Sequence, residues 1–254
     1  WKSDLPGREA EKWKVAADGK PLLLAKDADG TPQAITAAPW VAPHPRGGRM
    51  VVLGTGRLLD DADRGTASTQ SIYGILDADD GAPAPVDRSD LVRQAIAPEP
   101  VGTSSGRQLW TSTANPVATE GPSARRGWYV DLLATGERVV ANPQRFEGKL
   151  VDVLSMAPSA AFRQTPLPES CEAPATRHFR TTLNVLDGAR PRSQLYGEPG
   201  TALNASRVEL GGVTSLPVKQ AGQERRLTFD GIEQEATRRS LDFVVRRAGW
   251  RQLQ

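Results

Sequence analysis

Three groups of acidic residues are the first candidates for chemistry in this sequence, because carboxylate oxygens are the ligands that calcium prefers in proteins. They are Asp27 and Asp29, then Asp60, Asp61 and Asp63, then Asp77, Asp79 and Asp80. None of them reproduces a calcium loop that ends in a bidentate glutamate. Aspartate side chains also accept hydrogen bonds from nearby backbone N–H groups, which makes aspartate common in turns. We therefore predict turns at all three places and assign no metal ligand.

Cys171 is the only cysteine and therefore the only candidate thiol nucleophile. A catalytic thiol needs a base beside it. The two histidines, His44 in PHPRGG and His178 in TRHFR, have no spacing that brings them to Cys171 or to a carboxylate by local geometry. A single cysteine also forms no disulfide within the chain. The favoured interpretation is a semi-buried thiol, or one whose partner lies outside this chain, and no catalytic residue is assigned.

Trp110 and Trp128 are the candidates for an aromatic platform under a stacked cofactor. Aromatic residues at strand positions usually pack in a core instead. The sequence also has no vicinal cysteine pair. We therefore expect both tryptophans to pack between strands and assign no cofactor-binding residue.

Composition predicts a folded protein built from many short strands. The 254 residues include 24 Gly and 20 Pro, which disfavour long helices, and 38% are hydrophobic, which is enough for a core. The formal charge of +2 creates no long-range field of the kind that attracts nucleic acid or an anionic membrane. No apolar run approaches the ~18 residues of a membrane-spanning helix, and no signal peptide is visible. We expect neither a membrane span nor a nucleic-acid partner.

Two strands are predicted most firmly. Met50–Leu53 is a short apolar run that can be buried on both faces, and Gly54 and Gly56 end it where the backbone needs freedom that a Cβ would deny. Ser71–Leu76 is a second strand-forming run, and the Asp and Gly residues of Asp77–Gly81 predict a turn after it.

Four further segments also favour strands. Trp13–Ala16 and Leu22–Lys26 predict a hairpin, because Asp-Gly at the centre of ADGK is a strong turn signal. Trp128, Val130 and Leu132 alternate with more polar residues, which indicates a half-buried strand. In Glu233–Arg247 a helix competes because charges would pair at helical spacing, but the run Phe243–Val245 favours a strand.

A loose internal repeat relates two parts of the chain. Pro39 aligns with Pro143 and Val51 with Val151, at offsets of 104 and 100 residues. The repeated order is a proline-broken strand, a buried strand and a later strand that ends in Leu-Asp. The offset exceeds the ~40–50 residues of one propeller blade, so two blades per offset are expected. No change in composition divides the chain, and we treat residues 1–254 as part of one domain.

Several segments, in order, resemble the C-terminal β-propeller region of the type IV pilus tip-associated PilY/PilC family. They are WKSDL at Trp1, TPQAITAAPWV (Thr31–Val41), VVLGTGRLL (Val51–Leu59), QSIYGILD (Gln70–Asp77), RSDLV (Arg88–Val92), GWYVDLLATGERVVANP (Gly127–Pro143) and GWRQL (Gly249–Leu253). The resemblance implies an all-β fold, a modified, quinoprotein-like β-propeller. WKSDL is typical of the end of a strand, so we expect a piece of a longer protein that holds the later blades.

The resemblance also implies a function. It indicates a non-enzymatic protein that acts in pilus biogenesis and surface adhesion and contacts minor pilins or a host-cell or abiotic surface ligand. Such a protein is exported through the periplasm to the pilus tip on the outer cell surface. In the family, a calcium loop lies upstream of the position that corresponds to Trp1, so no cofactor is expected in this segment.

Two other classes of function remain open at the level of sequence. One is an enzyme, either a quinoprotein dehydrogenase or a hydrolase that uses Asp or His on a propeller face. A quinoprotein needs a central acid and base over a stacked cofactor. The other is a propeller scaffold for an intracellular complex. A shared fold does not by itself imply an enzyme, and pilus biogenesis is the favoured interpretation.

Overall fold

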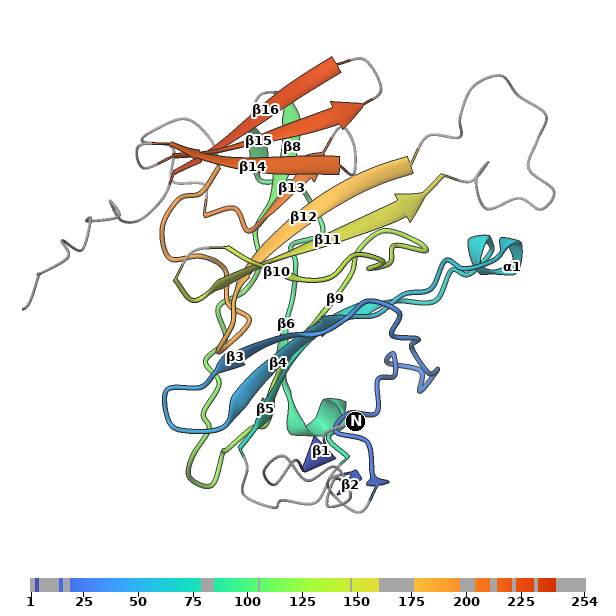
Figure 1. The fold of residues 1–254 in the computed structure, drawn as a ribbon, viewed down its shortest axis with the longest axis vertical. Helices are drawn as coiled ribbons and strands as arrows, with labels where there is room; N and C mark the ends of the chain where they lie inside the picture. The colour runs from blue at the N-terminus through green and yellow to red at the C-terminus, as the bar shows by residue number, and fades with distance from the viewer. Residues whose placement is uncertain are drawn as a thin grey trace, which may run out of the picture.

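The structure is a computed structural model that describes residues 3–4, 14–15, 19–78, 85–104, 106–146, 148–159, 176–196, 204–210, 214–220, 223–230 and 233–240. Strands dominate it (Figure 1). The described helical elements include α1 (Asp61–Arg64) and the short 3-10 helix η3 (Arg88–Asp90). The predicted all-β class is confirmed. No described helix has the length and apolar character needed to span a membrane.

A five-stranded sheet forms the lower half of the molecule in Figure 1. Its strands, in spatial order, are β3 (Trp40–Pro43), β4 (Arg49–Gly54), β5 (Ser71–Asp77), β9 (Gly127–Asp131) and β6 (Val92–Gln94). The first four are antiparallel to their neighbours, whereas β6 runs parallel to β9. β3 is therefore an edge strand.

A six-stranded antiparallel sheet lies above it in Figure 1. Its strands, in spatial order, are β10 (Gln144–Arg145), β11 (Leu150–Pro158), β12 (Thr176–Asn184), β13 (Arg207–Leu210), β8 (Arg107–Trp110) and β7 (Gly102–Ser104). In sequence, β7 and β8 come between β6 and β9, so the chain leaves the five-stranded sheet, adds two strands to the other sheet and returns.

Two smaller sheets lie toward opposite ends of the molecule (Figure 1). One pairs β1 (Ser3–Asp4) with β2 (Lys14–Val15). The other contains β14 (Thr214–Gln220), β15 (Gln223–Asp230) and β16 (Glu233–Ser240). The preference for a strand over a helix is confirmed for Glu233–Ser240, and the rest of that segment, including Phe243–Val245, lies outside the described residues.

The predicted N-terminal hairpin is wrong in its described residues. β2 pairs with β1 and not with the segment Leu22–Lys26. In that segment Leu23 bridges Val86 and Lys26 bridges Pro32. The Asp-Gly turn signal is a local one, and the long-range pairing of Leu23 with the segment at Val86 overrides it.

The central strands of the two large sheets are buried on both faces, which was predicted for the run Met50–Leu53. Strand β5 is buried at six of its seven positions, and β4 is buried from Val52 to Gly54 as well as at Met50. Strand β9 alternates as predicted, because Trp128 and Val130 are buried while Tyr129 is half-buried. The strand β4 continues through Gly54, whose missing Cβ leaves room for Val139, and the chain takes a positive φ of 150° only at Gly56.

The main core lies between the two large sheets. One face of the five-stranded sheet contributes Met50, Val52, Ile72 and Trp128, and the six-stranded sheet contributes residues of β11 and β12. Separate clusters cover the outer face of each sheet. Burial on both sides of a sheet is the arrangement expected when sheets stack face to face.

The internal repeat is confirmed in strand order. In the five-stranded sheet β3, β4 and β5 form an antiparallel meander, and in the six-stranded sheet β10, β11 and β12 form the same meander. The backbone N–H of Ala38 donates to Asn142 Oδ1 at 2.8 Å, and these two residues are 104 positions apart. Each copy of the meander is part of a different large sheet. Among the described residues, the two four-stranded blades expected within each offset are therefore not seen.

Candidate functional site

The first acidic group forms the predicted turn. Asp27 Oδ1 accepts hydrogen bonds from the backbone N–H groups of Asp29 at 3.0 Å and Thr31 at 2.8 Å. An oxygen that already accepts two backbone bonds is engaged in fixing the loop. Of the third group, Asp77 ends β5, and Asp79 and Asp80 lie outside the described residues.

The second acidic group caps α1. Asp63 N–H donates to Asp60 Oδ1 at 3.0 Å, and Asp60 N–H donates to Asp63 Oδ2 at 3.3 Å, which is a reciprocal capping box. Asp63 is buried and forms an ion pair with Arg57 at 2.6 Å. Within the described ranges, no set of three or more His, Cys, Asp or Glu side chains is placed to hold a metal ion.

The pKa of Asp63 lies below its ordinary value. The main cause is the N–H of Leu59, which donates to Asp63 Oδ2 at 2.8 Å; burial opposes this, and Arg57 and the N–H of Asp60 lower the pKa further. A carboxyl whose pKa is lowered by folding stabilises the folded state above its unfolded pKa, near ~3.9. That stabilisation is lost as the pH falls through the lower pKa of the folded protein.

Replacing Asp63 with Asn is expected to weaken the loop at α1 at neutral pH and to remove its response to acid. The measurement is hydrogen exchange of the Leu59 and Asp60 amides between about pH 2 and pH 7, corrected for intrinsic rates. The native protein should lose protection below about pH 4, whereas D63N should change little there. Asp61→Asn is the matched control, because Asp61 is 66% exposed and pairs with Arg64 in the same helix. An equal acid response in D63N would contradict the assignment.

The structure describes the two candidate bases, His44 and His178, at separate places. His44 lies in the exposed loop after β3, where its Nδ1 accepts a hydrogen bond from Arg46 N–H at 3.3 Å. His178 is buried on β12, and its Nε2 lies 2.8 Å from Thr176 Oγ1. Cys171 lies outside the described residues. The two histidines therefore occupy separate places, and each bonds to its own loop or strand.

The two tryptophans pack between strands as predicted. Trp128 is fully buried, and its Nε1–H donates to the carbonyl oxygen of Val185 at 2.9 Å. Its ring lies directly against Gly74 on one side and Gly188 on the other, where a Cβ would overlap the indole. Trp110 contacts Phe179 edge to face, with ring centroids 5.7 Å apart. Neither ring offers a free face for a stacked cofactor.

A ring of hydrogen bonds that sequence reasoning did not find joins the sequence motifs. Tyr73 Oη lies 2.6 Å from Gln33 Oε1 and 2.9 Å from the carbonyl oxygen of Lys26. Gln33 Nε2 donates to Ser71 Oγ at 2.9 Å, and Ser71 Oγ donates to Asp131 Oδ1 at 2.7 Å. The pKa of Tyr73 is raised, chiefly by burial, so its hydroxyl stays protonated at neutral pH.

Arg88 closes this ring. Its Nη2 donates to both oxygens of Asp131, at 2.5 and 2.6 Å, and its Nη1 donates to the carbonyl oxygen of Lys26 at 2.8 Å. Its guanidinium also lies 4.0 Å from the centre of the Tyr129 ring. Burial lowers the pKa of Arg88, but its hydrogen bonds and charge interaction with Asp131 raise it more. Both oxygens of Asp131 are thus paired with Arg88.

This network, from Lys26 through Tyr73 and Asp131 to Arg88, explains why the motifs have their residue types. Gln33 belongs to TPQAITAAPWV, Tyr73 to QSIYGILD and Arg88 to RSDLV. Buried polar groups are stable only when each finds a partner, and here they satisfy one another. The one usable signal in the sequence was polar Ser71 and Asp131 within otherwise apolar strands. Through this network the motifs hold the fold together.

A second buried charge pair fixes the six-stranded sheet to the turn after β9. Glu137 Oε1 accepts from Arg207 Nη1 at 2.7 Å, and Oε2 accepts from Arg207 Nη2 at 3.0 Å. Ser155 Oγ donates to Glu137 Oε1 at 2.6 Å. The side chains of both partners are at most 1% exposed, and Arg207 lies 3.8 Å from the centre of the Phe179 ring.

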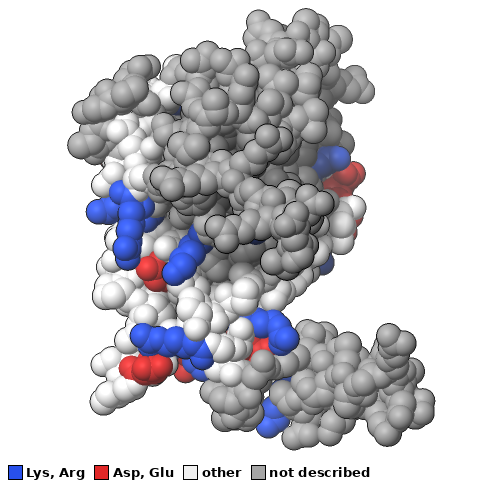
Figure 2. All heavy atoms as spheres, turned by 60° about the vertical axis from the view of Figure 1, so that its left-hand side comes forward, with Lys and Arg blue, Asp and Glu red and all other residues white. Residues whose placement is uncertain are grey.

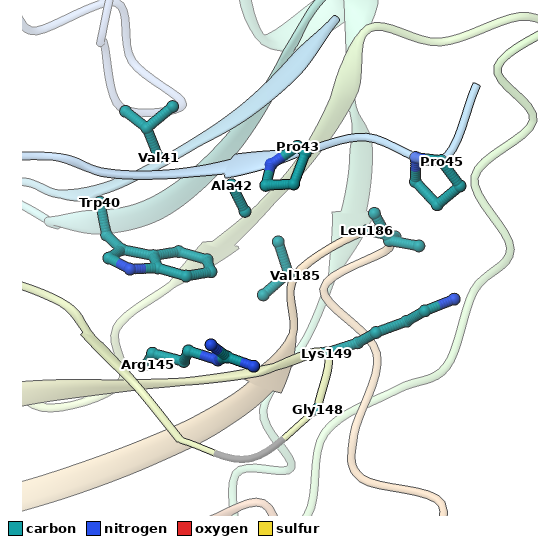
Figure 3. A pocket seen from close by; sticks show the side chains of 10 residues that line it. All are labelled: Trp40, Val41, Ala42, Pro43, Pro45, Arg145, Gly148, Lys149, Val185 and Leu186. Atoms are coloured by element: carbon teal, nitrogen blue, oxygen red, sulfur yellow. The ribbon is translucent and has the colours of Figure 1, made fainter. Parts of the chain in front are cut away.

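Among the described residues, one of the open sites on the surface combines apolar and cationic side chains. On the face in Figure 2, the described Lys and Arg side chains lie in small groups, several with Asp or Glu beside them. A cavity of about 400 Å³ lies between edge strand β3 and the β10–β11 hairpin and is called here the β3–β10 groove (Figure 3). Trp40, Pro43, Pro45 and Leu186 line it together with Arg145 and Lys149.

Known proteins share sequence with this chain. The family profile of the PilY1 beta-propeller domain matches residues 3–100. Type IV pilus biogenesis factor PilY1 of Pseudomonas aeruginosa is 34% identical over 140 residues, which are 50% of this chain and 12% of that protein. A PilY1 homolog of Xylella fastidiosa is 31% identical over 153 residues, 56% of this chain and 10% of that protein. The PilY1 of another P. aeruginosa strain is 28% identical over 245 residues, 87% of this chain and 21% of that protein.

A solved structure shares the fold. The crystal structure of the Pseudomonas aeruginosa PilY1 C-terminal domain matches with a TM-score of 0.68 at 23% identity, over 90% of this chain and 49% of that chain. The chain therefore spans about half of the solved domain and a small part of the full-length relatives. The predicted β-propeller class and the resemblance to the pilus-tip family are both confirmed.

Proposed function

Because residues 3–100 match the PilY1 beta-propeller family and the fold matches the PilY1 C-terminal domain, we propose that the chain is a non-enzymatic module of that family that acts in type IV pilus biogenesis and surface adhesion. In this proposal it contacts minor pilins or a host-cell or abiotic surface ligand. The protein that carries it is exported through the periplasm and displayed at the pilus tip. Support comes from the relatives named type IV pilus biogenesis factor.

The observation that carries the proposal is the network from Gln33 to Arg88. The polar residues of the sequence motifs bond to one another in a closed set of hydrogen bonds, and Asp131 forms an ion pair with Arg88. Such a set rigidifies the sheet it joins. A stiff sheet assembly with a wide surface suits a protein that holds a partner.

Deleting the chromosomal segment that encodes residues 19–210 is expected to leave few or no surface pili. The measurement is the amount of pilin in the sheared surface fraction, with electron microscopy as a second readout. Point variant Gly65→Ala, at an open position, should leave piliation normal. Normal piliation by cells that produce the shortened protein, without residues 19–210, at native levels would overturn the proposal.

A further inference from the structure

The β3–β10 groove combines an apolar wall with a cationic wall. Trp40 and Pro43 belong to β3, Pro45 follows it, and Leu186 lies in the turn after β12. Arg145 ends β10, and Lys149 precedes β11. Figure 3 shows the Trp40 ring facing the Arg145 side chain across the groove, with Lys149 farther along the same wall as Arg145. The volume of about 400 Å³ is in the range of ligand sites.

The two cations have no internal counter-charge in the structure. Arg145 and Lys149 are exposed, and neither forms an ion pair with an acidic side chain among the described residues. None of the described residues that line the groove is acidic. Glu147 lies between them in sequence but outside the described residues, and counting it still leaves a net positive rim. The matching ligand is an anion with an apolar part that packs on Trp40.

The lining favours a peptide over an acidic sugar. Apart from the two cations, the side chains that line the groove are apolar, so sugar hydroxyls would be buried there without partners. β3 and β10, which both contribute residues to the groove, are edge strands of their sheets. An extended peptide gains backbone hydrogen bonds at an edge strand. Pro43 and Pro45 lack an N–H, so they limit the added segment to a short one.

We propose that the β3–β10 groove binds a short acidic peptide segment of a partner protein in extended conformation. Alternate side chains of an extended peptide point to opposite sides. In a Glu-Phe-Glu segment, the two carboxylates reach Arg145 and Lys149 while the aromatic ring lies on Trp40. This site does not depend on the pilus role, so its failure leaves that proposal unaffected.

The test is fluorescence anisotropy with the intact protein and a labelled, terminally blocked peptide Gly-Glu-Phe-Glu-Val-Gly. Arg145→Gln with Lys149→Gln should weaken binding by at least about tenfold, since hydrogen bonds between charged groups are lost. Arg125→Gln is the matched control, because Arg125 is exposed and its guanidinium bonds only to the carbonyl oxygen of Ala124. Trp40→Ala should also weaken binding. Two control peptides, one with Gln and one with Lys at both Glu positions, should each bind more weakly than the Glu peptide.

Three results would overturn the proposal. One is equal binding of the peptides with Gln or Lys in place of Glu, which would remove the role of charge. Another is unchanged affinity in the Arg145 and Lys149 double variant. The third is that the intact protein binds an oligogalacturonate, an acidic sugar, and does not bind the peptide. Far-ultraviolet circular dichroism of each variant separates lost binding from lost folding.

Discussion

Gly74→Ala is expected to destabilise the protein by about 3 kcal/mol, the upper part of the range for overpacking a core. The new Cβ would overlap the indole of Trp128, which is fully buried. The ring has no room to retreat, because Gly188 lies against its other side with a φ of +66°. Trp128 is also held by its hydrogen bond to the carbonyl oxygen of Val185.

The measurement is urea unfolding of Gly74→Ala beside Gly65→Ala. Gly65 ends α1 with a φ of −72°, and a Cβ there would meet only the Ala62 carbonyl oxygen at 3.8 Å. Its replacement should change the free energy of unfolding by no more than about 0.5 kcal/mol. Equal midpoints for the two variants at equal slopes would mean that the indole shifts freely and that the close packing at Gly74 is unimportant.

Glu137→Gln is expected to cost about 3–5 kcal/mol, because it leaves the Arg207 cation buried without its counter-charge. The amide keeps the shape of the carboxylate but replaces one acceptor with a donor beside the Arg207 guanidinium. Adding Arg207→Met should recover part of the loss, since it removes the buried cation along with its partner. The readout is the free energy of unfolding of both single variants and the double variant, combined as a thermodynamic cycle.

Strand β13, which contains Arg207, also supplies a control for this prediction. Glu209 pairs with Arg177 at 2.8 Å, and the side chains of that pair are 21% and 49% exposed. Both arginines also lie over Phe179, so the two pairs differ mainly in burial. Glu209→Gln should cost no more than about 1 kcal/mol, as for exposed ion pairs. A Glu137→Gln loss as small as that would mean that water reaches Arg207 in the folded protein.

What the sequence predicted well was local. The apolar runs at Met50–Leu53 and Ser71–Leu76 and the alternation at Trp128–Leu132 each carry their own burial pattern, and the structure places all three in sheets. The turn at Asp27 was predictable because an aspartate bonds to backbone only a few residues away. The β-propeller class came from the order of the motifs and not from the strand pattern.

What the sequence could not supply was long-range partnership. The ion pair of Arg88 with Asp131 joins residues 43 positions apart, and Gln33 bonds to Ser71 across 38. Nothing in the type or spacing of these residues identifies the partner, since each would read as an ordinary polar position. The failed hairpin at Leu22–Lys26 has the same cause, because Leu23 bridges Val86 rather than its sequence neighbours.

The path of β7 and β8 has a mechanical consequence. β7 and β8 belong to the six-stranded sheet, whereas β6 before them and β9 after them belong to the five-stranded sheet. The chain therefore crosses between the two sheets twice within this segment and connects them. Neither can be peeled away without extracting strands from its neighbour. Tension applied to the chain should therefore meet a single rupture event for this pair of sheets, and not two successive ones.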